Sequence, residues 1–391
     1  MAVLGFSEGA SGALLGLVGR QCALLPSYEF ARQELAGRGT PLDIKVVHRL
    51  ARTLGAQVLT TRRRDLLRWR AGQLPAGQEL AGKRVAAMVD GGRARLRKVT
   101  RKQRGRGKKK AQRRRYQADW REPKLLILFE VDERGRMKAG TQPWIDGTFG
   151  GPDEAMELLA FHLHRLGAAA AEVVVFAADG APWIWDRLDW VERRVGLPAK
   201  RSVRVLDWCH AVHNLSLALD ALGLAAAERQ RWFKQLRRWL RGGKYGLVVT
   251  ALDDLGETQG WPEALTQPVE YLRKHAAAGH LNYACLRRKG LPVGSGAVES
   301  AIRRVINLRL KGPGLMWLEG NAEGALVLRA AAVTGRWEEV LTHVREEMGS
   351  DRQLVWQWQA PDMVAELKAG KEIKPPEAQE ASGSRDREEA A

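Results

Sequence analysis

The chain reads Val173-Val174-Val175-Phe176-Ala177-Ala178-Asp179-Gly180 near its middle, and this stretch decides the fold class. A short, continuous apolar run of this kind is typical of a strand in a sheet buried on both faces. Such a sheet needs helices above and below it. We therefore expect an α/β architecture with an aspartate held at the carboxyl end of an inner strand.

More strands are predicted on either side of this run. Val85–Val89 is a second buried run that ends at Asp90-Gly91-Gly92, and basic residues alternate with apolar ones over 93–97 and extend it. The remaining elements are strands at Leu125–Val131, Met137–Trp144 and Val203–Leu206, and helices at Pro152–Leu166 and Trp183–Val195. The order β-β-β-α-β-α-β is that of an RNase H-like core, a mixed five-stranded sheet with flanking helices.

Helical patterns fill the N-terminal region. Tyr28–Leu35 and Ile44–Leu54 carry apolar residues at helical spacing, and Gly37-Arg38-Gly39 links them as in a helix-turn-helix. Two ordinary packed helices would give the same pattern. Nearby arginines favour the DNA-binding interpretation; they are Arg62, Arg63, Arg64, Arg68 and Arg70.

Pattern and composition divide the chain into five segments. They are a helical, DNA-binding N-terminal region at 1–80, a first core part at 83–207 with a basic loop at 98–121, an all-helical insertion at 208–289, a second core part at 290–347, and a tail at 368–391. The tail is rich in Glu, Lys, Pro, Ser and Arg, which predicts disorder. In the second core part, a helix is expected over Ser295–Leu310, stopped by Gly312-Pro313-Gly314.

The charge of the chain indicates a polyanionic partner. With 64 Lys and Arg against 45 Asp and Glu, the net charge is 64 − 45 = +19, which favours nucleic acid or an anionic membrane surface. Fourteen of the basic residues lie in Arg93–Arg115 without any acid, so the rest of the chain carries 19 − 14 = +5. No apolar run is long enough to span a bilayer. Three widely separated cysteines form neither a disulfide framework nor a CxxC metal site, which favours a cytoplasmic protein.

Three carboxylates stand where metal-dependent phosphoryl transfer would need them. Asp90 and Asp179 each end a predicted strand, and Glu299 lies in the first turn of a predicted helix. Mg²⁺ prefers oxygen ligands, and two such ions can activate an attacking hydroxyl and stabilise the leaving oxygen. The glycines after both aspartates would let a phosphate backbone approach. In a basic protein, the expected substrate is nucleic acid.

Each of these acids also has a simpler explanation. Asp-Gly is a common turn dipeptide, and the helix dipole alone favours a glutamate in a first turn. Asp132 and Asp146 are rival acids; a turn explains Asp132, which leaves Asp146 as the more serious rival. The strand context that Asp90 and Asp179 share favours the catalytic interpretation.

A second polar group follows the strand at Val203–Leu206. Asp207, His210 and either His213 or Asn214 could share a helix face near the active site. We favour a structural hydrogen-bond cluster over a metal or phosphate contact, because a zinc site would need a second pair of ligands.

Basic and aromatic residues provide candidate DNA contacts. Dense positive charge repels itself, and a polyanion relieves this repulsion through counterion release. Trp317 is a candidate for stacking on an unpaired base. The full set of candidates is Arg93, Arg95, Arg97, Arg113, Arg114, Arg115, Arg303, Arg304, Arg309, Lys311 and Trp317.

Several segments strongly resemble bacterial insertion-sequence transposases of the Kra type. They are Leu291-Pro292-Val293-Gly294-Ser295-Gly296-Ala297-Val298-Glu299-Ser300, then Arg309-Leu310-Lys311-Gly312 with Trp317, and Ala330-Ala331-Ala332-Val333-Thr334-Gly335-Arg336-Trp337. The wider pattern is similar to that of Mutator-like transposases: Asp-Gly on the first strand, Asp-Gly after the fourth, a Cys/Asp-x-x-His motif, a helical insertion, and Glu on a helix. Asp90, Asp179, Asp207 with His210, and Glu299 match that order, within roughly residues 80–345.

The resemblance implies a DDE transposase of the bacterial cytoplasm, associated with the nucleoid when bound to DNA. Asp90, Asp179 and Glu299 would hold two Mg²⁺ ions, with Mn²⁺ able to substitute. The N-terminal region would recognise terminal inverted repeats, water would cut the element ends, and the freed 3′-hydroxyl would attack target DNA. Because two ends are joined, a homodimer or larger assembly is expected. The alternatives are a structure-selective nuclease on the same fold and a non-catalytic DNA-binding protein, such as an inactive transposase copy.

Overall fold

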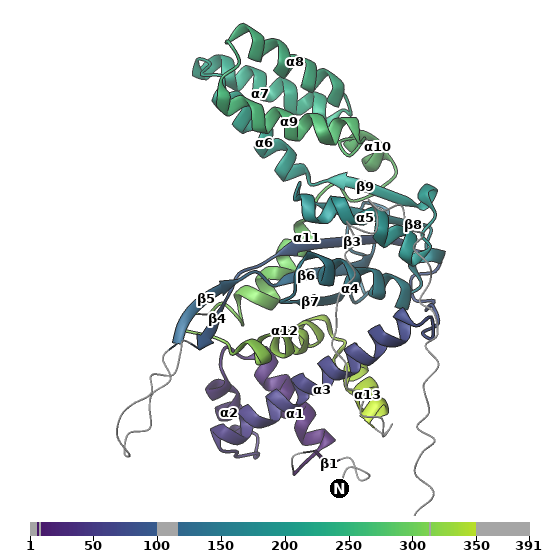
Figure 1. Ribbon diagram of the computed structural model, residues 1–391, viewed down its shortest axis with the longest axis vertical. Helices are drawn as coiled ribbons and strands as arrows, with labels where there is room; N and C mark the ends of the chain where they lie inside the picture. Colours follow the sequence, from purple (N-terminus) through teal and green to yellow (C-terminus); the bar gives the residue numbers. More distant parts are fainter. Residues whose placement is uncertain (1–5, 8, 100–115, 313, 349–391) are drawn as a thin grey trace, which may run out of the picture.

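A mixed five-stranded sheet flanked by helices forms the centre of the molecule, which confirms the α/β prediction (Figure 1). The computed structural model describes residues 6–7, 9–99, 116–312 and 314–348. The sheet has the order β7-β6-β3-β8-β9. Its strands are β3 (Arg84–Gly91), β6 (Lys124–Glu130), β7 (Trp144–Thr148), β8 (Val173–Ala178) and β9 (Ser202–Leu206).

β3 is the first strand of this sheet along the chain, and it lies at the centre of the sheet. β6 runs antiparallel to β3, and β7 runs antiparallel to β6. On the other side, β8 runs parallel to β3 and β9 runs parallel to β8. Parallel strands need crossover helices, and α4 (Pro152–Arg165) and α5 (Pro182–Val195) supply them. The carboxyl ends of β3, β8 and β9 therefore meet at one edge of the sheet.

Five helices separate β9 from the last part of the chain and project from the sheet (Figure 1). They are α6 (Trp208–Ala221), α7 (Ala226–Arg241), α8 (Tyr245–Thr258), α9 (Glu263–Ala277) and α10 (Tyr283–Arg288). The chain then returns to the sheet in α11 (Gly296–Ile302), η4 (Arg303–Asn307), α12 (Glu319–Thr334) and α13 (Trp337–Met348). No helix in the part of the chain that the structure describes is long and apolar enough to cross a membrane.

The basic extension predicted for the first strand is instead a separate hairpin. β3 ends at Gly91, and β4 (Ala94–Val99) pairs with β5 (Tyr116–Arg121) in a two-stranded ribbon. The residues of β5 were predicted to form a loop, because their charged and aromatic side chains do not show the apolar–polar alternation of a strand. The ribbon buries Ala94 and Leu96 on one face. The middle of the predicted basic loop, residues 100–115, lies outside the described residues, as does the predicted tail at 368–391.

Two further predicted boundaries were wrong. The strand expected at Met137–Trp144 begins only at Trp144, because Gly135 and Gly140 adopt the left-handed φ angles of turns, +77° and +79°. The helix expected over Ser295–Leu310 changes at Arg303 into a five-residue π-helical segment that ends at Asn307. The change from α-helix to π-helix does not alter the apolar periodicity of the sequence, so it could not be predicted from that periodicity.

The N-terminal helices pack against the last part of the chain and share its hydrophobic core. They are α1 (Gly12–Leu24), α2 (Tyr28–Gly37) and α3 (Ile44–Arg70), preceded by the short strands β1 (Phe6–Ser7) and β2 (Ala10–Ser11). α3 is one helix of 27 residues. It crosses α12 closely, since a Cβ added to Gly55 would lie 3.2 Å from the Cα atom of Gly324. Any DNA contact of this region must therefore use the outer faces of these helices.

The interpretation as DNA contacts was wrong for three of the five arginines of α3, since Arg62, Arg64 and Arg70 are mostly buried. Arg68 is paired but its side chain is 42% exposed, so for this residue DNA contact stays a prediction. Arg62 pairs with Asp146 at 2.9 Å and with Glu323. The other pairs are Arg70 with Glu157 at 2.6 Å, Arg68 with Glu347 at 2.5 Å, and Arg64 with the carbonyl oxygen of Glu347 at 2.8 Å. Arg63 is exposed. The arginines serve to hold α3 to the sheet and to α13.

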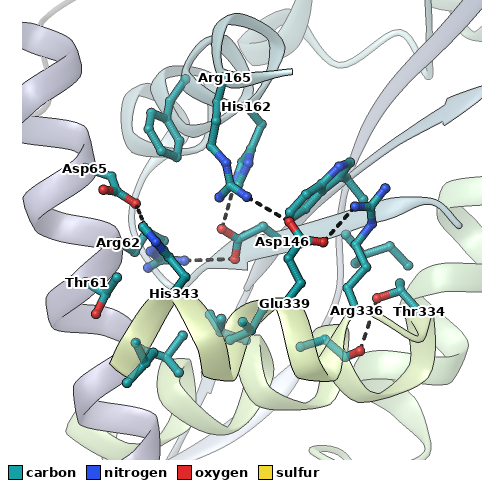
Figure 2. Close-up of a pocket in the computed structure, with 18 residues that line it drawn as sticks. Thr61, Arg62, Asp65, Asp146, His162, Arg165, Thr334, Arg336, Glu339 and His343 are labelled. Atoms are coloured by element: carbon teal, nitrogen blue, oxygen red, sulfur yellow. Dashed lines mark hydrogen bonds and ion pairs between the residues drawn. The ribbon is translucent and has the colours of Figure 1, made fainter. Parts of the chain in front are cut away.

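Asp146 lies in a buried polar cluster with Arg62 and His162, beside a cavity of about 70 Å³ (Figure 2). Its carboxylate contacts Arg62 and, at 2.8 Å, Nε2 of His162. Burial disfavours ionisation of Asp146, but the Arg62 guanidinium and His162 overcome it and lower the pKa of the carboxyl to about 2. The negative charge of Asp146 is thus balanced by partners within the fold.

Candidate active site

Three aspartates lie side by side at the carboxyl ends of the three parallel strands. The β3–β8 register has a constant offset, 173 − 84 = 89, and Asp90 and Asp179 keep it, since 179 − 90 = 89. The β8–β9 register has the offset 202 − 174 = 28, and Asp179 and Asp207 keep it, since 207 − 179 = 28. The backbone N–H of Asp207 also donates to the carbonyl oxygen of Ala178 at 2.8 Å. Ligand sites in sheets of this kind form at such an edge.

The pairing of the strands also shows that Asp146, the alternative candidate for a catalytic acid, does not lie with Asp90 and Asp179. Residues paired directly across neighbouring strands project to the same face of a sheet. Asp146 pairs with Leu126, which pairs with Val89, whereas Asp90 pairs with Leu125. Asp146 therefore projects to the face opposite that of Asp90. Asp132, as predicted, belongs to a turn, where its carboxylate accepts from the N–H groups of Arg134 and Arg136.

Asp90 is a half-buried carboxylate with other acids near it. Burial raises the pKa of Asp90 to about 6, and the negative charges of Asp179 and Glu299 add to the rise. The hydrogen bond from Gly91 N–H, at 2.6 Å, opposes it. None of the ion pairs found between described residues involves Asp90, Asp179 or Glu299. The structure thus brings the three predicted catalytic residues together, with the imidazole of His210 as a nearby positive charge when it is protonated.

Glu299 reaches this edge because α11 packs against β3 and β6. Gly92, just after β3, has no room for a side chain, since a Cβ there would lie 2.5 Å from Ile306. Glu299 itself is exposed and lies one turn beyond Ser295. Its charge also helps to raise the pKa of Cys209, after the effect of burial. The helix-borne acid therefore faces the same space as the two strand-borne acids.

Asp207 joins the strand edge to the start of α11. It is 1% exposed, and one carboxylate oxygen accepts from the backbone N–H of Ser295 at 2.6 Å and from its hydroxyl at 3.0 Å. The other oxygen accepts from the backbone N–H of His210 at 2.9 Å and lies 3.0 Å from its Nδ1. Although burial opposes ionisation, the hydrogen bonds from His210 and Ser295 lower the pKa of Asp207 to about 2. The anion fixes the position of the helix that carries Glu299.

The two histidines that were predicted near the site, His210 and His213, have different surroundings. The hydrogen bond to Asp207 raises the pKa of His210, and the nearby charges of Asp179 and Glu299 add to the effect. His210 therefore lies within the electrostatic field of the three acids. His213 is exposed further along α6. The predicted structural cluster thus contains Asp207, His210 and Ser295 but not His213, while Asn214 donates only to the carbonyl oxygen of His210, at 3.0 Å.

Two aromatic residues of the site were not found from the sequence. Tyr271 of α9 covers Gly180 and accepts from its N–H, and burial, with the charge of Asp179 adding to it, raises the pKa of the phenol. Trp185 of α5 donates from Nε1 to the carbonyl oxygen of Asp179 at 2.5 Å. Trp185 also stacks on His280 with 4.3 Å between ring centroids. Neither residue carries a motif, because each is brought to Asp179 only by the packing of its helix.

Side chains of the protein lie beside each glycine that follows Asp90 and Asp179, and the role of these glycines in DNA approach stays a prediction. Tyr271 occupies the space above Gly180, Glu122 that above Gly91, and Ile306 that above Gly92. A side chain at any of these positions would meet the protein itself.

Two predicted DNA contacts are buried and were wrong. Arg309 is 2% exposed, donates from Nε to the carbonyl oxygen of Cys22 at 2.9 Å, and lies over the rings of Tyr28 and Trp317. Trp317 is 6% exposed and donates from Nε1 to the carbonyl oxygen of Leu310 at 3.0 Å. Both residues fasten the N-terminal helices to the segment after η4. Neither can touch a nucleic acid without unfolding that contact.

The other described candidates remain accessible to differing extents. Arg93, Arg303 and Lys311 are exposed, whereas Arg95, Arg97 and Arg304 are half-buried. Arg113, Arg114 and Arg115 lie outside the described residues.

The exposed face of the β4–β5 ribbon combines arginines with aromatic rings. Arg95 lies 5.5 Å from the ring centroid of Trp120, and Arg97 lies 5.0 Å from that of Tyr116. The two rings are themselves exposed, Trp120 by 53% and Tyr116 by 45%. An alternation of guanidinium groups and accessible rings is suited to phosphates and bases.

No three His, Cys, Asp or Glu side chains within the described ranges form a ready-made cluster around a single metal ion. Comparison with protein-family models, with curated proteins and with solved structures finds no match for this chain.

Proposed function

We propose that the protein is a DDE transposase, a polynucleotidyl transferase that cuts and joins DNA with Asp90, Asp179 and Glu299. The observation that supports this most is the shared row of Asp90 and Asp179 with Glu299 beside it, three carboxylates that form no ion pair with any described residue. The strand order β7-β6-β3-β8-β9, with α6–α10 inserted before α11, is consistent with an RNase H-like core interrupted by a helical insertion.

The residues at this edge fit a pair of Mg²⁺ ions, with Mn²⁺ able to substitute. Their donors are all carboxylate oxygens, which these ions prefer. In other parts of the fold the buried acids have guanidinium or imidazole partners, such as Arg62 and His162 at Asp146. Asp90, Asp179 and Glu299 would hold these ions. When bound, the ions would lower the pKa of the attacking water or 3′-hydroxyl and stabilise the leaving oxygen.

The protein's own residues would position the reactants. Asp207 and Ser295 hold α11 so that Glu299 stays opposite the aspartates. A protonated His210 would attract a phosphate oxygen toward the acids, since its pKa is raised by the hydrogen bond to Asp207. The β4–β5 ribbon, with Arg93, Arg303 and Lys311, would contact the DNA backbone near the site. Joining two ends requires at least two active sites, so we propose a homodimer or larger assembly on DNA.

A strand-transfer assay tests the proposed function. The purified protein is incubated with target DNA and a labelled duplex carrying the inverted repeat that flanks its coding sequence, with Mg²⁺ or with EDTA. Joined products that require Mg²⁺ and the repeat are expected. Cutting without joining, and without preference for the repeat, would favour the structure-selective nuclease. Binding without any reaction would favour a non-catalytic DNA-binding protein.

Mg²⁺ is expected to stabilise the protein more at high pH than at low pH. The pKa of Asp90 in the folded protein, about 6, exceeds the ordinary value of an aspartate, 3.8. In the metal-free protein, ionisation of Asp90 therefore costs stability, a cost absent below pH 4 and complete above pH 6. Thermal unfolding with and without Mg²⁺ should show a melting-temperature rise of several degrees at pH 8 and a much smaller rise at pH 5. In an Asp90→Asn variant the rise at pH 8 should be lost; an equal rise would contradict the assignment.

Replacing Asp207 with alanine is expected to slow strand cutting about 10²-fold without weakening DNA binding, because a displacement of about 1 Å at a reacting group has an effect of this size. The variant removes the four contacts with His210 and Ser295. Single-turnover cutting rates and DNA affinity are measured together. An Asp220→Ala variant on the same helix, which loses only surface contacts with Arg229 and Ser216, is the control. Equal cutting rates for the two variants would exclude the positioning role.

A further inference from the structure

Helix α7 presents a row of basic side chains that was not predicted from the sequence. Over Ala226–Arg241 it contains six Lys and Arg residues and one acid, Glu228. Five of the basic residues are exposed: Arg231, Lys234, Arg237, Arg238 and Arg241. Positions 231, 234, 238 and 241 follow the 3-4-3 spacing of a single helix face.

The opposite side of α7 is the one that packs on the protein. Leu236 and Leu240 are fully buried, and Trp239 and Phe233 are packed against the core beside them. α7 contacts α6, α8 and α10 through this side. The basic face is thus turned to solvent by the fold and is held rigidly in a helix.

The charges of this face are not neutralised within the protein. Arg231 has only Glu228, at 3.8 Å, and Arg238 donates to the neutral amide of Gln235 at 2.9 Å. Among described residues no acid pairs with Lys234, Arg237 or Arg241. Arg287 of α10 adds another positive charge, because its guanidinium donates to the carbonyl oxygen of Arg241. Such self-repulsion is relieved when a polyanion binds.

An open groove on the same face adds an aromatic and an amide group. It is lined by Arg231, Trp232, Lys234, Gln235 and Arg238. The indole N–H of Trp232 is buried and has no hydrogen-bond partner within the described residues. Positive charges and the amide of Gln235 therefore line the groove together.

We propose that the α7 face is a second DNA-binding surface, which contacts the phosphate backbone of a duplex away from the reacting strand. From Arg231 to Arg241 the helix rises about 15 Å, enough to follow several consecutive phosphates. Asp207 caps the N-terminus of α6, so the helices that include α7 begin at the edge of the sheet that carries the aspartates. This inference rests on the proposed function, since it takes double-stranded DNA as the ligand.

The salt dependence of DNA binding tests the proposal. One variant carries Arg231→Gln, Lys234→Gln, Arg238→Gln and Arg241→Gln. The matched control carries Arg134→Gln, Arg136→Gln, Arg193→Gln and Lys200→Gln, four exposed residues at the opposite end of the parallel strands. Affinity for a labelled duplex is measured in EDTA over a range of salt concentrations. Each lost phosphate contact should reduce the slope of log K against log salt by about 0.9.

We expect the α7 variant to show a slope less steep by about two to four units, while the control keeps nearly the slope of the unmodified protein. A further variant with lysine at positions 231, 238 and 241 should retain the slope, which separates loss of charge from loss of fold. If the glutamine variant matches the control, the α7 surface is not a DNA site, although the proposed function can still hold. If the unmodified protein binds no duplex, both proposals are overturned.

Discussion

Asp179→Asn is expected to abolish metal-dependent strand cutting while DNA binding persists. Asparagine keeps the size of the side chain but removes the negative charge that a metal ion needs. The loss of one carboxylate ligand should cost several kcal/mol in the transition state, which corresponds to a rate decrease of about 10³-fold or more. Cutting rates under single-turnover conditions and duplex affinity in EDTA provide the two measurements.

An Asp186→Asn variant is the matched control for this prediction. Asp186 is exposed on α5, so the same chemical change is made seven residues away without touching the site. It should cut DNA at the rate of the unmodified protein. Cutting by Asp179→Asn at a rate near that of the control would show that the aspartates at the strand ends do not carry the reaction.

Arg62→Ala is expected to destabilise the protein strongly, by about 3–5 kcal/mol, the cost of removing one partner from a buried ion pair. The change would leave Asp146 and Glu323 without the guanidinium that both contact. His162 would remain as a partner of Asp146 (Figure 2). Denaturant-induced unfolding measures the change in the free energy of unfolding.

Arg63→Ala tests whether that effect belongs to the buried pair. Arg63 is the neighbouring residue on α3 but is exposed, so its replacement should change the free energy of unfolding by less than about 0.5 kcal/mol. A similar small change for Arg62→Ala would contradict the structural role of the cluster. It would also reopen the interpretation of α3 arginines as DNA contacts.

The sheet and the acids at its edge could be predicted because their signals are local. β8 is a run of apolar residues that needs no partner to be recognised, and the aspartate that follows it is fixed by the end of the run. The same holds for β3 and Asp90. Asp207 was expected near the site because it ends another strand, but its contact with Ser295 joins positions 88 residues apart and had no signal in the sequence.

The errors concern residues whose roles depend on distant partners. Arg309 looked like a phosphate contact beside Glu299, yet its partner is the carbonyl oxygen of Cys22, 287 residues away. Arg62 looked like part of a basic DNA-binding run, yet Asp146 lies 84 residues away. An arginine on a helix has the same sequence pattern whether it faces solvent or a buried acid. The basic face of α7 was overlooked for the opposite reason, because its charges are spaced by the helix and not consecutive.

The most direct test of the central claim is anomalous scattering from crystals of the protein grown with a DNA end and Mn²⁺. Two Mn²⁺ peaks are expected at the edge of the sheet beside Asp90, Asp179 and Glu299, separated by about 3.5–4 Å. The Asp90→Asn variant should lose at least one peak. Peaks located elsewhere, or none beside Asp90 and Asp179 when DNA is bound, would contradict a two-metal site built from these three carboxylates.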